Sequence, residues 1–206
     1  MSATPQSVQD DLAFMRALVE SGTGIQRPFG EAYLAAGICY GVQMILSAGQ
    51  SLGRLPHTVH WSLTIGLAPT VVFLAVLAWI IWRNRHAVRT GVVGRAIGAV
   101  FASVGIANLV LVAVIGSVAL RQHSLTTWLI YPCAVFVLQG AAWLVAFSLH
   151  RSAWPALVAI GWFAAAIVMA CYIETTAWFL VSAAIGFVLL MVVPGAVITR
   201  ISHANT

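Results

Sequence analysis

The stretch AWFLVSAAIGFVLLMVVPGAVIT, residues 177–199, decides the fold class of this chain, because it contains no charged side chain from end to end. A helix needs about 20 mostly apolar residues to cross the ~30 Å hydrocarbon layer of a bilayer. Strands of a membrane barrel alternate apolar and polar residues, whereas this stretch is apolar on every side. It therefore predicts a membrane-spanning α-helix.

Five more stretches of the same kind precede it. We predict spans at about residues 31–50, 61–82, 96–120, 128–149 and 154–173, six in all with 177–199. The segments between them are short, carry turn residues and charges, and are not long enough to fold alone. The sequence thus predicts an all-α integral membrane protein, a six-helix bundle at 29–200 between an N-terminal segment, 1–28, and a tail, 201–206.

The composition excludes water-soluble classes of protein. Of the 206 residues, 61% are hydrophobic and 7% are charged, whereas a soluble domain carries about 25% charge. The net charge of +5 comes from Arg alone, since the sequence has no Lys. In a membrane protein Arg residues flank the spans and set their orientation, so we expect the lipid bilayer, and not nucleic acid, as the partner of these charges.

The Arg residues divide unequally between the two ends of the predicted bundle. One end has Arg54 and Arg121, and the other has eight: Arg16, Arg27, Arg83, Arg85, Arg89, Arg95, Arg151 and Arg200. Cytoplasmic loops carry the excess of basic residues. We therefore predict that both termini are cytoplasmic and that the protein lies in a bacterial inner membrane.

The N-terminal segment predicts a short amphipathic helix at about residues 8–20. Ser7 has the character of an N-cap, and Asp10 and Asp11 suit the positive start of a helix. Apolar residues fall on one stripe of this helix, which is too short to cross a bilayer. Because it is acidic and not rich in Lys or Arg, we expect it to dock on protein, either the chain's own spans or a partner subunit.

Three amide side chains fall inside the predicted spans: Gln43, Asn108 and Gln139. An amide in hydrocarbon needs a hydrogen-bond partner, so the favoured interpretation is a set of clamps between helices. The alternative is a polar path for a small solute. Apart from Glu31 at the entry of the first span and Arg95 at the entry of the third, the predicted spans contain no charged side chain. We expect Glu31 to pair with Arg95 or Arg27.

Small residues four apart recur in three of the spans. Such residues share one helix face and let two backbones approach closely. We favour packing inside the bundle over a dimer face for these candidate helix-packing residues: Gly37 and Gly41, Gly94 and Gly98, Ser182 and Gly186. Pro69 and the pair Pro194–Gly195 predict bends in the second and sixth spans.

The outer loops hold weak candidates for a metal site. Imidazole and carboxylate groups bind Zn²⁺ or Cu²⁺, and four such residues are predicted on this face: His57, His60, His123 and Glu174. The alternative is that they are solvated interface residues. Cys133 and Cys171 are expected near the same face, where we favour packing over a disulfide.

The sequence contains no hydrolase, kinase or phosphate-binding motif, so we expect neither enzyme activity nor a cofactor. The leading hypothesis is a non-enzymatic accessory, sensor or assembly subunit, with a protein partner at the cytoplasmic face or in a homo-oligomer. The first alternative is a transporter or channel for a small solute, lined by the three amides. The second is a metal-binding protein that uses the outer histidines.

Overall fold

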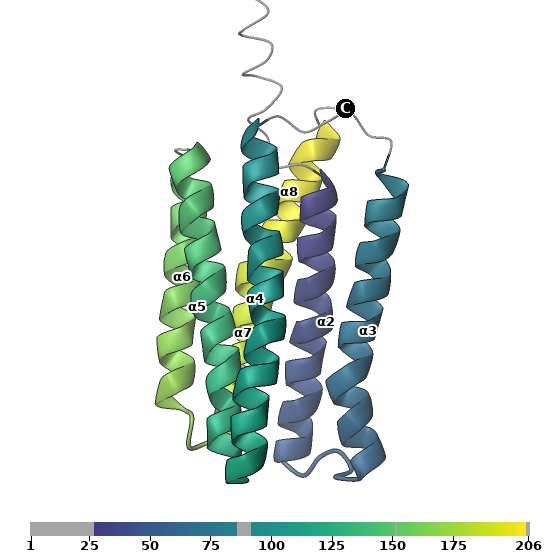
Figure 1. Ribbon diagram of the computed structural model, residues 1–206, viewed down its shortest axis with the longest axis vertical. Coiled ribbons are helices and arrows are strands. Elements are labelled where there is room, and N and C mark those ends of the chain that lie inside the picture. Colours follow the sequence, from purple (N-terminus) through teal and green to yellow (C-terminus); the bar gives the residue numbers. More distant parts are fainter. Residues whose placement is uncertain (1–26, 86–91, 151, 205–206) are drawn as a thin grey trace, which may run out of the picture.

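The computed structural model describes residues 27–85, 92–150 and 152–204 of the chain. The described part is helical from end to end apart from short turns (Figure 1). Its helices are α2 (Arg27–Ser51), α3 (Val59–Arg83), α4 (Val92–Gln122), α5 (Leu125–His150), α6 (Ala153–Cys171), α7 (Thr176–Phe187) and α8 (Val193–Ala204). A π-helical segment, η1 (Val188–Val192), joins α7 to α8. The amphipathic helix predicted at residues 8–20 lies outside the described residues.

The predicted six-span architecture is confirmed. Six helices are long and apolar enough to cross a membrane, and the sixth is the continuous rod of α7, η1 and α8. The chain is thus a multi-pass membrane protein. The helices extend beyond several predicted limits, because residues such as Arg27 and Gln122 continue a helix beyond the apolar run.

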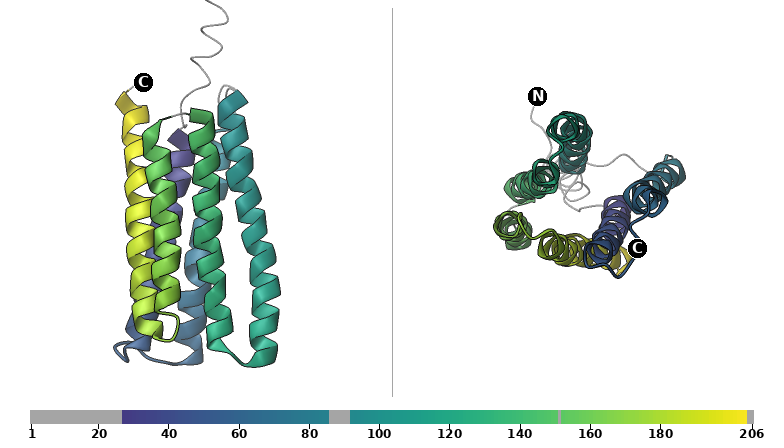
Figure 2. Two further views of the ribbon diagram at one scale, coloured as in Figure 1. Left: turned by 90° about the vertical axis from the view of Figure 1, so that its left-hand side faces the viewer. Right: turned by 90° about the horizontal axis from the view of Figure 1, so that it is seen from below.

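The helices are arranged as an open curve, seen end-on in Figure 2. The α2 helix packs against α3, α7, η1 and α8, while α6 packs between α7 and α5, and α5 against α4. Although α3 and α4 follow each other in sequence, they lie at the two ends of this curve and have no extensive contact among the described residues. The core is therefore centred on α2, α5, α6 and α7.

Large aromatic side chains fill that core. Phe136 and Trp143 of α5, Trp162 of α6 and Phe179 of α7 are all fully buried. The Phe136 ring meets Trp162 edge to face at 4.7 Å between centroids and Phe187 at 5.0 Å. Such edge-to-face pairs place the positive ring edge on the negative ring face, and here they connect α5 to both α6 and α7.

The predicted disturbance at Pro194–Gly195 takes the form of the π-helical segment. Pro194 has no N–H to donate and its ring crowds the preceding turn. The five residues Val188–Val192, which end two positions before Pro194, adopt the wider π-helix, and π-helical turns are frequent at functional sites. Pro69 lies within α3, and this helix continues through it.

Candidate functional site

A buried hydrogen bond joins α2 to the π-helical segment. The Tyr33 hydroxyl donates to the Leu190 main-chain oxygen at 3.2 Å, and Tyr33 is 4% exposed. In an α-helix each N–H donates to the carbonyl four residues earlier, and proline has no N–H. The Leu190 carbonyl, four residues before Pro194, therefore lacks its usual helical donor. Tyr33 thus supplies from another helix the proton that Pro194 cannot.

Two indole groups also meet the Tyr33 hydroxyl. The Trp143 Nε1 donates to the Tyr33 Oη at 2.6 Å, and both side chains are buried. The Trp162 indole lies near this hydroxyl, but its buried Nε1 makes no hydrogen bond with any described residue. The result is a polar centre built by side chains of three helices around the Leu190 carbonyl, which we call the Tyr33 centre: Tyr33, Trp143, Trp162 and the Leu190 carbonyl.

Glycines allow α2 to come this close to the sixth span. A Cβ atom added at Gly37 would lie 2.8 Å from the Met191 Cβ, and one at Gly195 would lie 2.7 Å from the Leu34 main-chain nitrogen. Real Cβ atoms do not approach backbone atoms so closely, so both positions require glycine for this packing. The close approach is what brings the Tyr33 hydroxyl within reach of Leu190.

The three predicted amides differ in what they do. The Gln43 Nε2 donates to the Gly66 main-chain oxygen of α3 at 3.2 Å, so Gln43 clamps α2 to α3. The Gln139 Oε1 and the Asn108 Oδ1 are buried and accept no hydrogen bond from the described residues. Gln139 lies on the same face of α5 as Phe136 and Trp143 and is 9% exposed. The structure does not show the three amides as one cluster.

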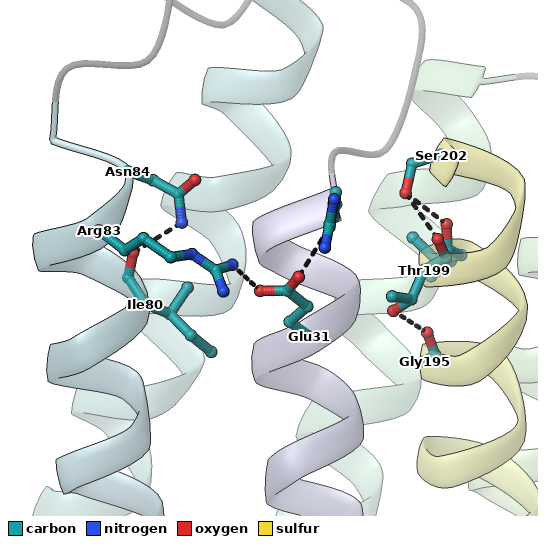
Figure 3. A network of polar contacts seen from close by, with 9 residues as sticks. Glu31, Ile80, Arg83, Asn84, Gly195, Thr199 and Ser202 are labelled. Carbon is teal, nitrogen blue, oxygen red and sulfur yellow. Dashed lines mark hydrogen bonds and ion pairs between the residues drawn. The ribbon is translucent and has the colours of Figure 1, made fainter. Parts of the chain in front are cut away.

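The ion pair of Glu31 is a second polar group, at the end of the bundle where α2 begins. Glu31 accepts a hydrogen bond from Arg27 Nε at 2.8 Å and another from Arg83 of α3. Figure 3 shows the Glu31 carboxylate facing the Arg83 guanidinium of α3. Of the two predicted partners Arg27 is correct, but the second is Arg83 in place of Arg95. The α3 helix packs closely along α2, whereas α4 meets α2 by ring contacts of Phe101 and has no extensive backbone contact with it. Arg83 also lies over the Trp79 ring, 4.5 Å from its centroid.

The small-residue pairs have different surroundings. Gly41 faces Phe187 of α7, and a Cβ added at Gly186 would lie 2.5 Å from the Phe136 ring, so both lie inside the bundle. Ser182, half-buried, donates its hydroxyl proton to the Phe179 carbonyl of its own helix. On α4, Gly94 is half-buried, whereas a Cβ added at Gly98 would meet no atom within 4 Å.

The four outer metal candidates do not form a site. The described residues include no group of three His, Cys, Asp or Glu side chains placed to hold a metal ion. His57 instead contacts the Gln50 main-chain oxygen at the end of α2, and His123 lies in the α4–α5 turn with a positive φ of 49°. His57, His123 and Glu174 lie in three different connections and His60 in the first turn of α3, so the structure does not bring these four predicted ligands together. The three described cysteines, among them Cys133 and Cys171, are free thiols.

The sequence interpretation missed Tyr33, Trp143 and Trp162, because each was counted only as an apolar residue of its span. One signal could have found them. Pro194 in a span predicts an unpaired carbonyl at Leu190, and a carbonyl in hydrocarbon needs a donor from elsewhere. Tyr and Trp side chains are the donors that an otherwise apolar bundle can offer.

The chain matches no protein-family model, no curated protein and no solved structure. Its function is therefore argued from its own residues.

Proposed function

We propose that the chain is a non-enzymatic accessory or assembly subunit of a membrane complex, and that α4 presents its contact face. The observation that carries this proposal is the exposure of α4. In the most apolar 18-residue stretch of α4, 6% of the residues are buried, against 39% in α5. Among the described helices, α4 has extensive contact with α5 alone.

The exposed face of α4 has the composition of a helix–helix contact. Gly98, Ala102, Gly105 and Leu109 lie on one side of the helix by their spacing, and all four are exposed. No atom lies within 4 Å of a Cβ built at Gly98 or Gly105. Helices associate in lipid through van der Waals packing between closely approaching backbones, so this face suits a transmembrane helix of another subunit.

Photo-crosslinking tests the proposal in native membranes. A benzophenone side chain is placed at Leu109 of α4, 71% exposed, or at the control position Leu157 of α6, 72% exposed. We expect one discrete adduct from position 109, lost in the Gly98→Leu background, and none from position 157. Mass spectrometry of the adduct separates a second copy of this chain from a different subunit. Equal products from both positions, or an adduct indifferent to Gly98→Leu, would contradict the proposal.

We also propose the orientation of the protein in a bacterial inner membrane. Arg27, Arg83, Arg85, Arg95 and Arg200 lie at the bundle end where α2 begins and α8 finishes, and Arg54 and Arg121 lie at the other end. The excess of Arg supports a cytoplasmic location for the first end, and with it for both termini.

A second candidate function is passage of a small neutral solute past the buried amides. The observation that favours it is the pair of buried acceptors, Gln139 Oε1 and Asn108 Oδ1, that accept no hydrogen bond from the described residues. A polar solute inside the bundle could donate hydrogen bonds to these two oxygens without displacing a hydrogen bond that they already accept. Uptake by vesicles containing the purified protein tests this candidate, and transport that survives Gln139→Leu with Asn108→Leu would contradict it.

A further inference from the structure

An apolar groove lies between α4 and α5 near the turn that joins them. It has a volume of about 740 Å³ and is open along one side. From α4 it is lined by Val112, Ala113, Gly116 and Leu120, and from α5 by Leu125 and Trp128. Nearly all of the surface inside it is apolar, so its occupant in a membrane is an apolar chain and not water.

Gly116 and Trp128 shape this groove. A Cβ added at Gly116 would lie 3.4 Å from the Cζ3 atom of the Trp128 indole. The absence of a side chain at Gly116 therefore lets the indole lie close to α4, where it forms one wall of the groove. The Trp128 ring is held in place by stacking on Tyr131 at 5.4 Å between centroids.

A cation stands at the edge of the groove. The Arg121 side chain folds back along α4, donating from Nε to the Ser117 main-chain oxygen at 3.1 Å and from Nη2 to the Ser117 Oγ at 3.4 Å. Ser117 itself lines the groove. Among the described residues no carboxylate pairs with Arg121, so its positive charge remains available to an anion.

We propose that this groove binds one acyl chain of an anionic phospholipid, with the lipid phosphate against the Arg121 guanidinium. The apolar part lies in the last turns of a membrane span, and the cation lies at the helix end, where headgroups are found. Guanidinium groups bind phosphate strongly through charge-assisted hydrogen bonds, and basic pockets beside transmembrane helices hold anionic headgroups. Trp128 lies in the first turn of α5, at the depth where tryptophan favours the membrane interface.

This inference does not rest on the proposed function. The partner face of α4 extends from Gly98 to Leu109, whereas the groove begins at Val112 and continues past the end of the helix. A partner helix in place of a lipid would have to bring an acidic group to Arg121, while an anionic phospholipid carries that charge already. Identifying the molecule bound in the groove distinguishes a lipid from a partner helix.

Native mass spectrometry of the detergent-solubilised protein tests the proposal. Phosphatidylglycerol and phosphatidylcholine with identical chains are added in separate titrations. We expect one phosphatidylglycerol to bind at least tenfold more tightly than one phosphatidylcholine. Arg121→Gln should remove this preference, while Arg54→Gln, the same change in the α2–α3 connection at the same end of the bundle, should leave it intact.

Filling the groove supplies the second part of the test. Gly116→Leu should abolish binding of both lipids, whereas Gly66→Leu, at an open position on α3, should not. Ala113→Phe fills the groove from its exposed side and replaces Gly116→Leu if that variant does not fold. The proposal is overturned if the two lipids bind equally in the unmodified protein, or if neither filled variant loses lipid. It is also overturned if the groove is found occupied by a protein helix.

Discussion

Tyr33 of α2 donates its hydroxyl proton to the main-chain carbonyl of Leu190 in the π-helical segment, and Leu190 is the residue four before Pro194. The bond therefore fills the position that the missing N–H of Pro194 leaves open. In hydrocarbon an unpaired carbonyl costs several kcal/mol. A proline that would destabilise an isolated helix is accommodated here because a neighbouring helix carries the donor.

Tyr33→Phe should lower the stability of the protein by about 1–3 kcal/mol, because the Trp143 N–H and the Leu190 carbonyl both lose their buried partner. Thermal unfolding in detergent measures the change. Tyr172→Phe is the control, since Tyr172 is 45% exposed at the end of α6. Pro194→Ala returns an N–H to the chain, so it should stabilise the Tyr33→Phe protein more than the unmodified one. Equal gains in this double-mutant cycle would refute the coupling.

Replacing glycine by alanine should lower the stability of the protein where two helices approach closely, and should not lower it where the glycine faces open space. Gly37→Ala and Gly195→Ala place a Cβ less than 3.0 Å from backbone or Cβ atoms of the neighbouring helix. Overpacking of this kind costs about 1–3 kcal/mol, and the melting temperature should fall. Gly98→Ala and Gly105→Ala meet open space and should keep or slightly raise it, because alanine favours helix over glycine. A fall at all four positions would show that general helix effects, and not the contacts of α2, explain the result.

The two glutamines should respond in opposite ways to replacement by leucine. Gln43→Leu loses the bond to the Gly66 carbonyl, and such interhelical bonds contribute about 0.6–2 kcal/mol, so the melting temperature should fall. Gln139→Leu removes a buried acceptor that accepts no bond from the described residues and should leave stability unchanged or raise it. A marked loss of stability in Gln139→Leu would mean that the amide is a clamp like Gln43.

The Glu31 contact should be modest in energy and sensitive to salt. Glu31 joins Arg27 and Arg83, whose side chains are 43% and 36% exposed, and exposed ion pairs contribute little. We expect Glu31→Gln to lower the melting temperature at low ionic strength. In about 0.5 M salt, where charges are screened, the melting temperatures of the variant and the unmodified protein should be closer together. Glu174→Gln, in the turn after α6, is the matched control and should change nothing. A difference that does not depend on salt would contradict the electrostatic explanation.

Reporter fusions measure the orientation in the membrane. Alkaline phosphatase, which is active only outside the cytoplasm, should be inactive when fused after Thr206 and active when inserted beside Arg121 in the α4–α5 turn. The physical reason is the excess of Arg at the end of the bundle where α8 finishes. The opposite pattern of activity would reverse the orientation and place the Arg121 groove in the cytoplasmic leaflet.

The sequence by itself determined the number and nature of the spans. Runs such as 177–199 are apolar on all sides, and lipid leaves the backbone no alternative to a helix that satisfies its own hydrogen bonds. The same rule located the disturbance at Pro194, because a proline removes one of those bonds wherever it stands in a helix. These are local constraints, so they can be predicted without knowing which helix lies beside which.

Only the tertiary structure decided which side chains meet. All six spans are apolar, so hydropathy does not specify their order around the bundle. Glu31 pairs with Arg83 because α3 is the neighbour that packs closely along α2. The same arrangement brings Tyr33 to Leu190, although 157 residues separate them in the sequence. It leaves Gly98 exposed while Gly37 is enclosed. Helix order depends on the fit between particular faces, above all where glycine allows two backbones to approach, and that fit is a property of pairs of helices, not of any one segment.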